Sequence, residues 1–163
     1  MDYLWSPWRY RYVSSGAPSS EADACLFCSK AASSDDRANL VVFRGEYNFI
    51  LLNLYPYTSG HLMIAPYAHV ASLQDASPVA LEEMMRLARR VDTALRQLYK
   101  PDGMNLGMNL GACAGAGVAG HIHMHVLPRW CGDASFMTTV SETRVLPEAL
   151  SVTWERLRDA LKV

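Results

Sequence analysis

The sequence predicts an α+β fold in which a five-stranded antiparallel sheet packs with one long helix and a C-terminal helix. Short turns rather than long crossovers join the first three β-rich runs, and this favours antiparallel pairing. An amphipathic stretch then follows, and two further β-rich runs flank a glycine-rich loop. The five β-rich runs are 40–43, 47–54, 62–65, 104–109 and 121–128.

The turns between the first three runs carry residues that interrupt strands. Gly45 separates the first two runs, and the Pro-Tyr-Thr-Ser-Gly segment 56–60 separates the second from the third. Glycine and proline fit the backbone angles of turns and pack poorly within a strand. These runs therefore form a meander.

The long helix is bounded by its own end signals. Ser77 is a favourable N-cap, Pro78 suits the first helical position, and Glu82 and Glu83 follow near the positive end of the helix dipole. The Pro-Asp-Gly segment 101–103 ends it. Its apolar stripe comprises Leu81, Met84, Met85, Ala88, Val91, Leu95 and Leu98. A shorter stripe, Leu150, Trp154, Leu157 and Leu161, predicts a final helix over 147–161.

Composition places the chain among ordinary cytoplasmic proteins. It has 163 residues, 50% hydrophobic and 19% charged, which suits one domain over 1–163. The net charge of −1 gives no field that attracts nucleic acid, and neither a signal peptide nor a membrane-spanning helix is expected. Four cysteines suggest thiols or a metal rather than disulfides. Residues 1–20 are expected to be irregular, with their aromatic side chains against the domain or a partner subunit.

The central feature of the sequence is a row of three histidines. His121, His123 and His125 alternate with apolar residues, and in a strand this alternation places the imidazoles on one face. Three interpretations are open: surface histidines, a metal site with His-x-His spacing, or a nucleophile oriented by its neighbours. We favour the nucleophile because of the loop that precedes the row.

That loop is suited to an anion. Residues 111–120 contain four glycines, so a ligand can approach the bare backbone. Consecutive backbone amides bind anions such as phosphate. Imidazole beside a phosphate cradle indicates phosphorus chemistry.

The His-apolar-His-apolar-His motif behind a glycine loop resembles the signature of the histidine triad (HIT) superfamily of nucleotide hydrolases and transferases. Segments 53–66 and 66–69 resemble the same superfamily. Segments 4–9, 128–137 and 145–148 resemble one branch, the diadenosine tetraphosphate phosphorylases. The resemblance covers nearly the whole chain and implies a HIT-like fold that forms homodimers.

The resemblance also implies a mechanism. His123 is the nucleophile that attacks the α-phosphorus of a nucleotide and forms a nucleotidyl-histidine intermediate. His121, His125 and His61 complete the catalytic set: His125 donates to phosphate oxygens and His61 supports it from the adjacent run. Neutral imidazole suits this role near pH 7, because its reference pKa is about 6.5. Water or inorganic phosphate then releases the nucleotide.

A Cys-x-x-Cys motif, Cys25 to Cys28, supplies half of a tetrahedral zinc site. A redox pair or two unconnected thiols are alternatives, although no βαβ unit of the thioredoxin kind is predicted nearby. In zinc-bearing family members the cysteine pair joins two histidines, which the resemblance places at His69 and His121. Such a zinc is structural, since four protein ligands leave no open position.

The nucleotide and phosphate contacts form a third group of candidates. Asn53 either holds a ribose hydroxyl or caps a turn, and Arg129 either assists at the site or marks a strand end. Many family members carry Gln where this chain has Gly117, so backbone amides must contact the phosphate here. The candidates are Leu51, Asn53, Asn109, Gly115, Ala116, Gly117, Arg129 and Trp130.

We therefore expect a homodimeric enzyme without an organic cofactor that cleaves dinucleoside polyphosphates at the α-phosphate. Phosphorolysis of diadenosine tetraphosphate to ATP and ADP is favoured, with nucleotide and inorganic phosphate as partners and with neither nucleic acid nor membrane. Hydrolysis of diadenosine polyphosphates or nucleoside phosphoramidates is the alternative. A metal-dependent hydrolase and a non-catalytic nucleotide-binding adaptor are further alternatives.

Overall fold

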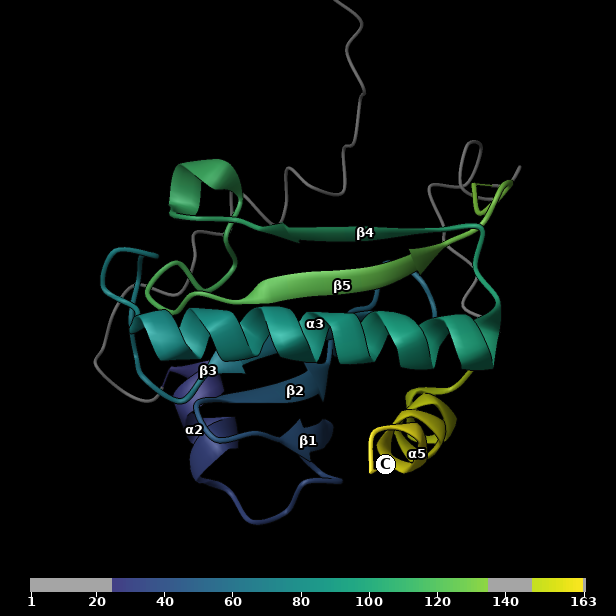
Figure 1. Ribbon diagram of the computed structural model, residues 1–163, viewed down its shortest axis with the longest axis horizontal. Helices are drawn as coiled ribbons and strands as arrows, with labels where there is room; N and C mark the ends of the chain where they lie inside the picture. The colour runs from purple at the N-terminus through teal and green to yellow at the C-terminus, as the bar shows by residue number, and fades with distance from the viewer. Residues whose placement is uncertain (1–24, 135–147, 163) are drawn as a thin grey trace, which may run out of the picture.

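The computed structural model describes residues 25–134 and 148–162 and contains one five-stranded antiparallel sheet (Figure 1). The sheet order is β1-β2-β3-β5-β4, so β5 lies between β3 and the edge strand β4. The strands are β1 (Val41–Arg44), β2 (Asn48–Leu52), β3 (Leu62–Pro66), β4 (Gly103–Met108) and β5 (Met124–Arg129). The helices are α2 (Leu26–Ala32), α3 (Pro78–Tyr99), the 3-10 turn η1 (Ala112–Ala114) and α5 (Leu150–Ala160).

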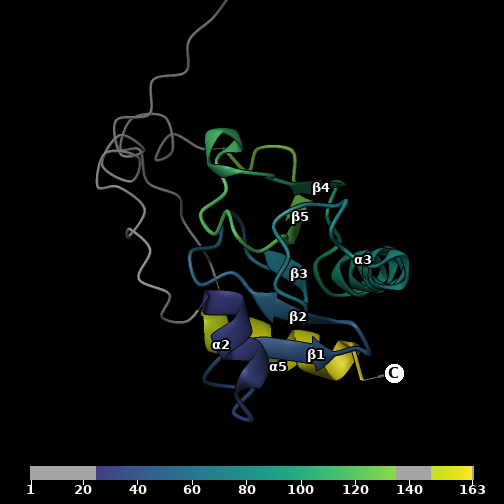
Figure 2. The same ribbon diagram turned by 90° about the vertical axis from the view of Figure 1, so that its left-hand side faces the viewer.

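The sheet separates two apolar layers, with α3 on one face and α2 on the other (Figure 2). Side chains of a strand alternate between the faces. From β2, Ile50 and Leu52 enter the layer under α3, whereas Phe49 and Leu51 enter the layer under α2. Trp154 of α5 joins the first layer and its indole N–H donates to the carbonyl of Val41 at 2.9 Å. The α+β prediction is confirmed.

All five predicted strands and both predicted helices are present. The bounds of β1 to β4 lie within two residues of the predicted ones. Two differences affect the site. First, β5 begins at Met124 and not at His121, because its pairing with β3 begins at the Ile64–Met124 pair. Second, α2 was not predicted. It has seven residues and no side-chain N-cap, and helices this short depend on tertiary contacts.

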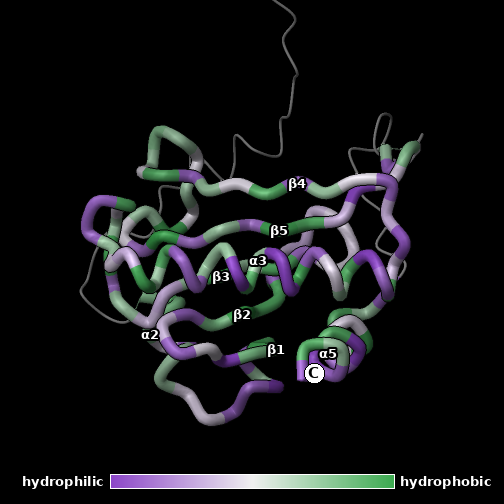
Figure 3. The backbone as a smooth tube through the Cα atoms, viewed as in Figure 1, coloured by the Kyte–Doolittle hydropathy of each residue, from purple (hydrophilic) through white to green (hydrophobic). Residues whose placement is uncertain are grey.

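The long helix follows its predicted end signals. The Ser77 hydroxyl accepts from the backbone N–H of Ala80 at 3.3 Å, and Lys100 ends the helix in the left-handed region. Apolar and polar segments alternate along the α3 tube in Figure 3. One predicted core residue is wrong: Met84 is buried, but Met85 is 57% exposed, because it lies on the outer face of the helix.

Glu83 does not simply interact with the helix dipole. Its carboxylate accepts from the backbone N–H groups of Glu46 and Tyr47 and from Nδ2 of Asn48, each at 2.8 Å. Burial alone raises the pKa of Glu83, but these hydrogen bonds outweigh it and the pKa is lowered. A Cβ on Gly45 would lie 2.8 Å from the carboxylate, so this turn requires glycine. Glu83 therefore fastens the β1–β2 turn to α3.

We expect Glu83→Ala to lower the free energy of unfolding by about 3 kcal/mol, because it leaves three donors without their charged acceptor. Urea denaturation measures this change. Its matched control is Glu82→Ala, which removes the exposed neighbouring carboxylate and is expected to cost no more than about 0.5 kcal/mol. Equal stability of the two variants would show that the turn does not depend on Glu83.

Residues 1–20, predicted to be irregular, lie outside the described residues. Within residues 25–134 and 148–162, no helix combines the length and the apolarity that a bilayer crossing requires.

Candidate active site

His123 precedes β5 and is only 4% exposed. Its Nδ1 lies 2.9 Å from the carbonyl oxygen of His121. A carbonyl only accepts, so the contact assigns the ring proton to Nδ1 and leaves a lone pair on Nε2. Burial lowers the pKa of His123, and the hydrogen bond offsets this only in part. The result is a neutral imidazole whose Nε2 is suited to nucleophilic attack.

His61 and His125 form a second pair with a definite direction. The backbone N–H of Tyr57 lies 3.2 Å from Nδ1 of His61 and donates to it, so His61 carries its proton on Nε2. That Nε2 lies 2.9 Å from Nδ1 of His125 and donates in turn. His125 therefore keeps its proton on Nε2. Its ring meets the ring of His123 edge to face, with centroids 5.0 Å apart. A hydrogen-bond donor thus lies beside His123.

Both rings of this pair stay neutral over a wide pH range. Burial, followed by the charge of His125, lowers the pKa of His61 to about 3. Burial, followed by the charge of His123, lowers the pKa of His125 to about 4. Protonation of His125 would place a second donor opposite the donor of His61. The arrangement is therefore maintained above about pH 4.

The glycine loop is partly closed on itself. Gly111 and Gly115 have φ angles of 85° and 87° at the two ends of η1, a region that side chains disfavour. Nδ2 of Asn109 donates to the carbonyl of Gly115 at 3.3 Å. The N–H groups of Gly115 and Ala116 donate to the carbonyls of Ala112 and Gly111 at 2.9 and 3.3 Å. Asn109 thus shapes the loop mouth.

These bonds revise the predicted phosphate contacts. The amides of Gly115 and Ala116 are engaged inside the loop, so they are not available to an anion. In the described part of the chain, the amides of residues 117–120 make no hydrogen bond to another residue. Gly117 thus begins a run of amides without internal hydrogen bonds, immediately before His121.

The alternation predicted that His121 and His123 share one strand face, but both residues precede β5. Its Nε2 donates to the carbonyl of Pro66 at 2.8 Å, and its Nδ1 lies 3.3 Å from Sγ of Cys25. The predicted row is wrong at this position because β5 begins only at Met124. The backbone before that residue is not held by the pairing of β5 with β3. His121 supports His123 through its carbonyl, while its ring faces the cysteines.

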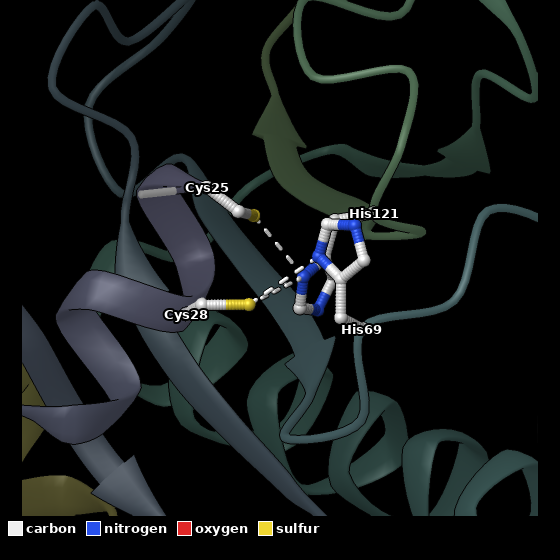
Figure 4. A group of neighbouring side chains, drawn as sticks. All are labelled: Cys25, Cys28, His69 and His121. Carbon is white, nitrogen blue, oxygen red and sulfur yellow. Dashed lines mark hydrogen bonds between the residues drawn. The ribbon is translucent and has the colours of Figure 1, made fainter. Parts of the chain in front are cut away.

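Cys25, Cys28, His69 and His121 bring four ligand atoms within 4.8 Å of one another (Figure 4). Sγ of Cys25 lies 3.3 Å from Nδ1 of His121. Sγ of Cys28 lies 3.3 Å from Nδ1 of His69 and 3.6 Å from Nδ1 of His121. Bond lengths in tetrahedral zinc sites place such ligands about 3.3 to 3.8 Å apart. The donor set and the spacing therefore fit a tetrahedral metal ion.

Three separate segments supply this cluster: the start of α2, the loop after β3, and the residue His121 before β5. Burial, followed by hydrogen bonding and charge from Cys25, raises the pKa of Cys28. The hydrogen bond from Nε2 of His121 to Pro66 leaves the lone pair on Nδ1, where a metal needs it. Within the described ranges, this is the one group of His, Cys, Asp or Glu placed to hold a metal.

Two predicted ligand contacts near β2 have other roles in the structure. Leu51 is fully buried in the layer under α2, so its side chain does not reach a ligand. Asn53 accepts from the backbone N–H of Tyr55 at 3.1 Å, which is the turn-capping alternative. Its Nδ2 also lies 3.4 Å from Nδ1 of His61, so it borders the histidine pair.

Arg129 and Trp130 lie away from the glycine loop. Arg129 is the last residue of β5 and Trp130 follows it, about 20 Å along the strand from His123. Nη2 of Arg129 donates to Asp133 at 2.9 Å and its Nη1 to Asn105 at 2.8 Å. Trp130 donates to a carbonyl at the end of α3 at 3.4 Å. Both residues stabilise the end of the strand in this chain.

Two aromatic residues at the site were not predicted. The ring centroid of Phe27 lies 4.7 Å from that of His123, and the ring centroid of Tyr57 lies 4.6 Å from that of His61. Phe27 lies between the two cysteines of the Cys-x-x-Cys motif, and this position was the available signal. Nothing in the turn around Tyr57 marks it.

The fold and the paired histidines define a site of the histidine triad type. A HIT domain model matches residues 35–131, which is more than half of the chain. The chain therefore belongs to the HIT domain family.

Named relatives and a solved structure extend this assignment. An "AP-4-A phosphorylase" of Mycobacterium tuberculosis is 37% identical over 151 residues, covering 90% of this chain and 77% of that protein. A "bis(5'-nucleosyl)-tetraphosphatase [asymmetrical]" of Schizosaccharomyces pombe is 30% identical over 95 residues, covering 58% and 52%. A Zn-bound histidine triad family protein from Mycobacterium smegmatis superimposes with a TM-score of 0.68 and 29% identity, covering 90% and 96%.

These comparisons confirm the predicted resemblance to the HIT superfamily and to its diadenosine tetraphosphate phosphorylase branch. They also confirm the prediction that the chain is a HIT enzyme, since both named relatives are enzymes. The antiparallel fold is confirmed by the superposition.

Proposed function

We propose that this chain cleaves dinucleoside polyphosphates at the α-phosphate through a nucleotidyl-His123 intermediate, with inorganic phosphate as the preferred acceptor. The observation that carries the proposal is the protonation pattern. The Nδ1–H bond to His121 leaves Nε2 of His123 as the nucleophile, and His125 beside it offers an Nε2–H donor. The similarity to an AP-4-A phosphorylase supports the substrate class.

In the first step, Nε2 of His123 forms a bond to the α-phosphorus, and the bond from phosphorus to the bridging oxygen breaks. The bonding electron pair leaves with that oxygen. His125 donates to phosphate oxygens as the negative charge shifts. The open amides of 117–120 add stabilisation, worth about 3 kcal/mol per donor in other enzymes. From diadenosine tetraphosphate, ATP departs and an AMP moiety stays on His123.

In the second step, an oxygen of inorganic phosphate forms a bond to the same phosphorus. The nitrogen–phosphorus bond breaks and Nε2 of His123 regains its lone pair. The product of this step is ADP, whereas attack by water gives AMP. The anion site at 117–120 supports the phosphate acceptor, because it offers amides to an incoming anion as well as to the substrate.

The alternatives have weaker support. A metal-dependent hydrolase built on three histidines is disfavoured, because the His121 ring faces the cysteines while His123 and His125 lie outside the metal cluster. A non-catalytic adaptor needs no fixed tautomers at its phosphate site, yet two histidines here have theirs assigned by hydrogen bonds.

Product analysis tests the proposal. Diadenosine tetraphosphate is incubated with the enzyme at millimolar phosphate and the nucleotides are separated. We expect ATP and ADP in equal amounts. AMP with ATP, unchanged by phosphate, would mean hydrolysis and would exclude the phosphorylase assignment.

Removing the donor of His61 should impair catalysis more than binding. His61→Phe keeps a planar ring but removes the Nε2–H that fixes His125, and we expect kcat to fall by about 100-fold with little change in KM. The matched control is Thr58→Val in the loop that leads to His61. This substitution deletes the 3.1 Å hydrogen bond that the Thr58 hydroxyl donates to the carbonyl of Pro128. Steady-state kinetics of both variants should separate them, and equal kcat values would remove His61 from the mechanism.

We propose zinc as the ion of the four-ligand cluster. Two thiolates and two imidazoles in tetrahedral spacing are the donors that zinc favours. The ion would hold α2 against the sheet and supply no open coordination position. The Zn-bound relative of Mycobacterium smegmatis supports this choice.

We propose that the chain forms a homodimer, and the edge of the sheet at β4 supports this proposal. In the described residues, β4 ends the sheet, and its Leu106 is 46% exposed. An open apolar edge invites pairing with a second strand. We expect a dimer by light scattering at micromolar concentration, and dissociation in Leu106→Lys. A monomeric wild-type protein would contradict the proposal.

A further inference from the structure

We infer that Phe27 is a positioning residue for His123: its ring, carried between the two cysteines of the metal cluster, holds the nucleophilic imidazole in its reactive orientation. The inference rests on the proposed role of His123 as nucleophile. It gives α2, which has no part in the proposed mechanism, a role in positioning His123.

The contact is close and buried. Phe27 is 1% exposed and His123 is 4% exposed. Their ring centroids are 4.7 Å apart with an interplanar angle of 33°. The same Phe27 ring lies 5.2 Å from the ring of His121. Both distances lie within the range of about 4.5 to 7 Å in which aromatic rings attract one another. Phe27 therefore packs against His123 and against His121, whose carbonyl accepts the hydrogen bond from Nδ1 of His123.

The hydrogen bond to the carbonyl of His121 is not sufficient to fix the nucleophile. It holds Nδ1 at 2.9 Å but allows the ring to rotate about that contact. The edge of His125 limits the ring on one side, with centroids 5.0 Å apart. Phe27 limits it on another. Together the three contacts restrict the orientation of the His123 ring.

The position of Phe27 depends on the metal cluster. Cys25 and Cys28 flank it in sequence and meet His69 and His121 through their sulfur atoms. The helix α2 has seven residues and no side-chain cap, so its own hydrogen bonds hold it weakly. The segment 25–28 thus supplies two residues of the metal cluster and the aromatic ring that packs against His123.

We expect Phe27→Leu to keep the layer under α2 apolar but to remove the planar ring that packs against His123. Misplacing a reacting group by about 1 Å can cost about 100-fold in rate, so we expect kcat to fall by about 10- to 100-fold. The KM should stay within about threefold, because only 1% of Phe27 is exposed.

Phe49→Leu is the matched control. Phe49 is fully buried in the same apolar layer, and the ring that it stacks on is Tyr67, at 5.4 Å. The substitution removes the same atoms from the same core without touching a histidine. We expect kcat within about threefold of wild type and an unchanged metal content.

The experiment combines kinetics with a readout independent of turnover. For each variant, kcat and KM are measured with diadenosine tetraphosphate and phosphate, zinc is counted, and the ring nitrogens of His123 are observed by ¹⁵N NMR. Phe27→Met serves as a second substitution if Phe27→Leu does not fold. We expect both Phe27 variants to retain zinc, lose kcat, and show averaged or shifted His123 nitrogen signals, unlike Phe49→Leu.

The outcomes separate the inference from the proposed function. Unchanged His123 signals in the Phe27 variants overturn the inference, whatever the kinetics. Altered signals with wild-type kcat mean that Phe27 does position the ring but that His123 is not the nucleophile. That outcome overturns the inference as well, because the inference rests on His123 being the nucleophile. Loss of kcat equal to that of Phe49→Leu also overturns it.

Discussion

Replacing His123 by alanine should reduce turnover of diadenosine tetraphosphate by at least about 10⁴-fold and leave nucleotide affinity within about tenfold. The atom that makes the bond to phosphorus is lost, whereas the loop amides and His125 remain. Steady-state kinetics and calorimetric titration with ADP measure the two effects. The uncharged state of the wild-type ring makes this loss independent of pH near neutrality.

Folding of this variant is checked by urea denaturation and by its zinc content, because His123 is buried against Phe27. Rates near those of the wild type in a folded His123→Ala protein would refute the nucleophile assignment. His125 would then be the histidine to examine, since its ring lies next in the site.

Loss of the metal should produce the largest loss of stability. We expect one zinc per chain in protein purified without added metal. Cys28→Ser should abolish it and lower the free energy of unfolding by about 3 kcal/mol or more, because α2 loses the ion that holds it. Metal analysis and urea denaturation measure the two changes.

Cys131→Ser is the matched control for this prediction. Cys131 is exposed, lies outside the cluster, and should keep both the zinc and the stability of the wild type. A folded and active wild-type protein without zinc would contradict the assignment of this cluster.

The strands and the long helix could be predicted because their signals are local. The N-cap at Ser77 and the proline after it mark the start of α3 without reference to the rest of the chain. The turns at Gly45 and 56–60 likewise delimit the first three strands. The four residues of the Cys-His cluster could be named as well, the two cysteines from the local Cys-x-x-Cys motif and the two histidines from the family resemblance.

The site differed from its prediction where the position of a residue depends on pairing between distant segments. Alternation alone placed His121 and His123 on one face, but the register of β3 with β5 begins only at Met124. No feature of residues 121–123 encodes that limit. In consequence the ring of His121 faces Cys25, and its backbone carbonyl accepts a hydrogen bond from Nδ1 of His123.

The open amides of the glycine loop and the helix α2 also depend on tertiary structure. Whether an amide in the glycine loop is open depends on how the loop closes, and Gly115 and Ala116 proved to be engaged. The helix α2 is too short for its sequence to predict it, and Phe27 inside it contacts His123 only through the tertiary fold. Arg129 pairs with Asp133, four residues later, which a motif comparison does not reveal.

The most direct test of the central claim is mass spectrometry of the peptide that contains His123. Enzyme and diadenosine tetraphosphate are mixed without phosphate, quenched rapidly at alkaline pH to preserve a phosphoramidate, and digested. We predict that the peptide gains the mass of one AMP moiety on His123, and that added phosphate removes it as ADP. An AMP moiety on a different residue, or an unmodified peptide during rapid turnover, would contradict the account.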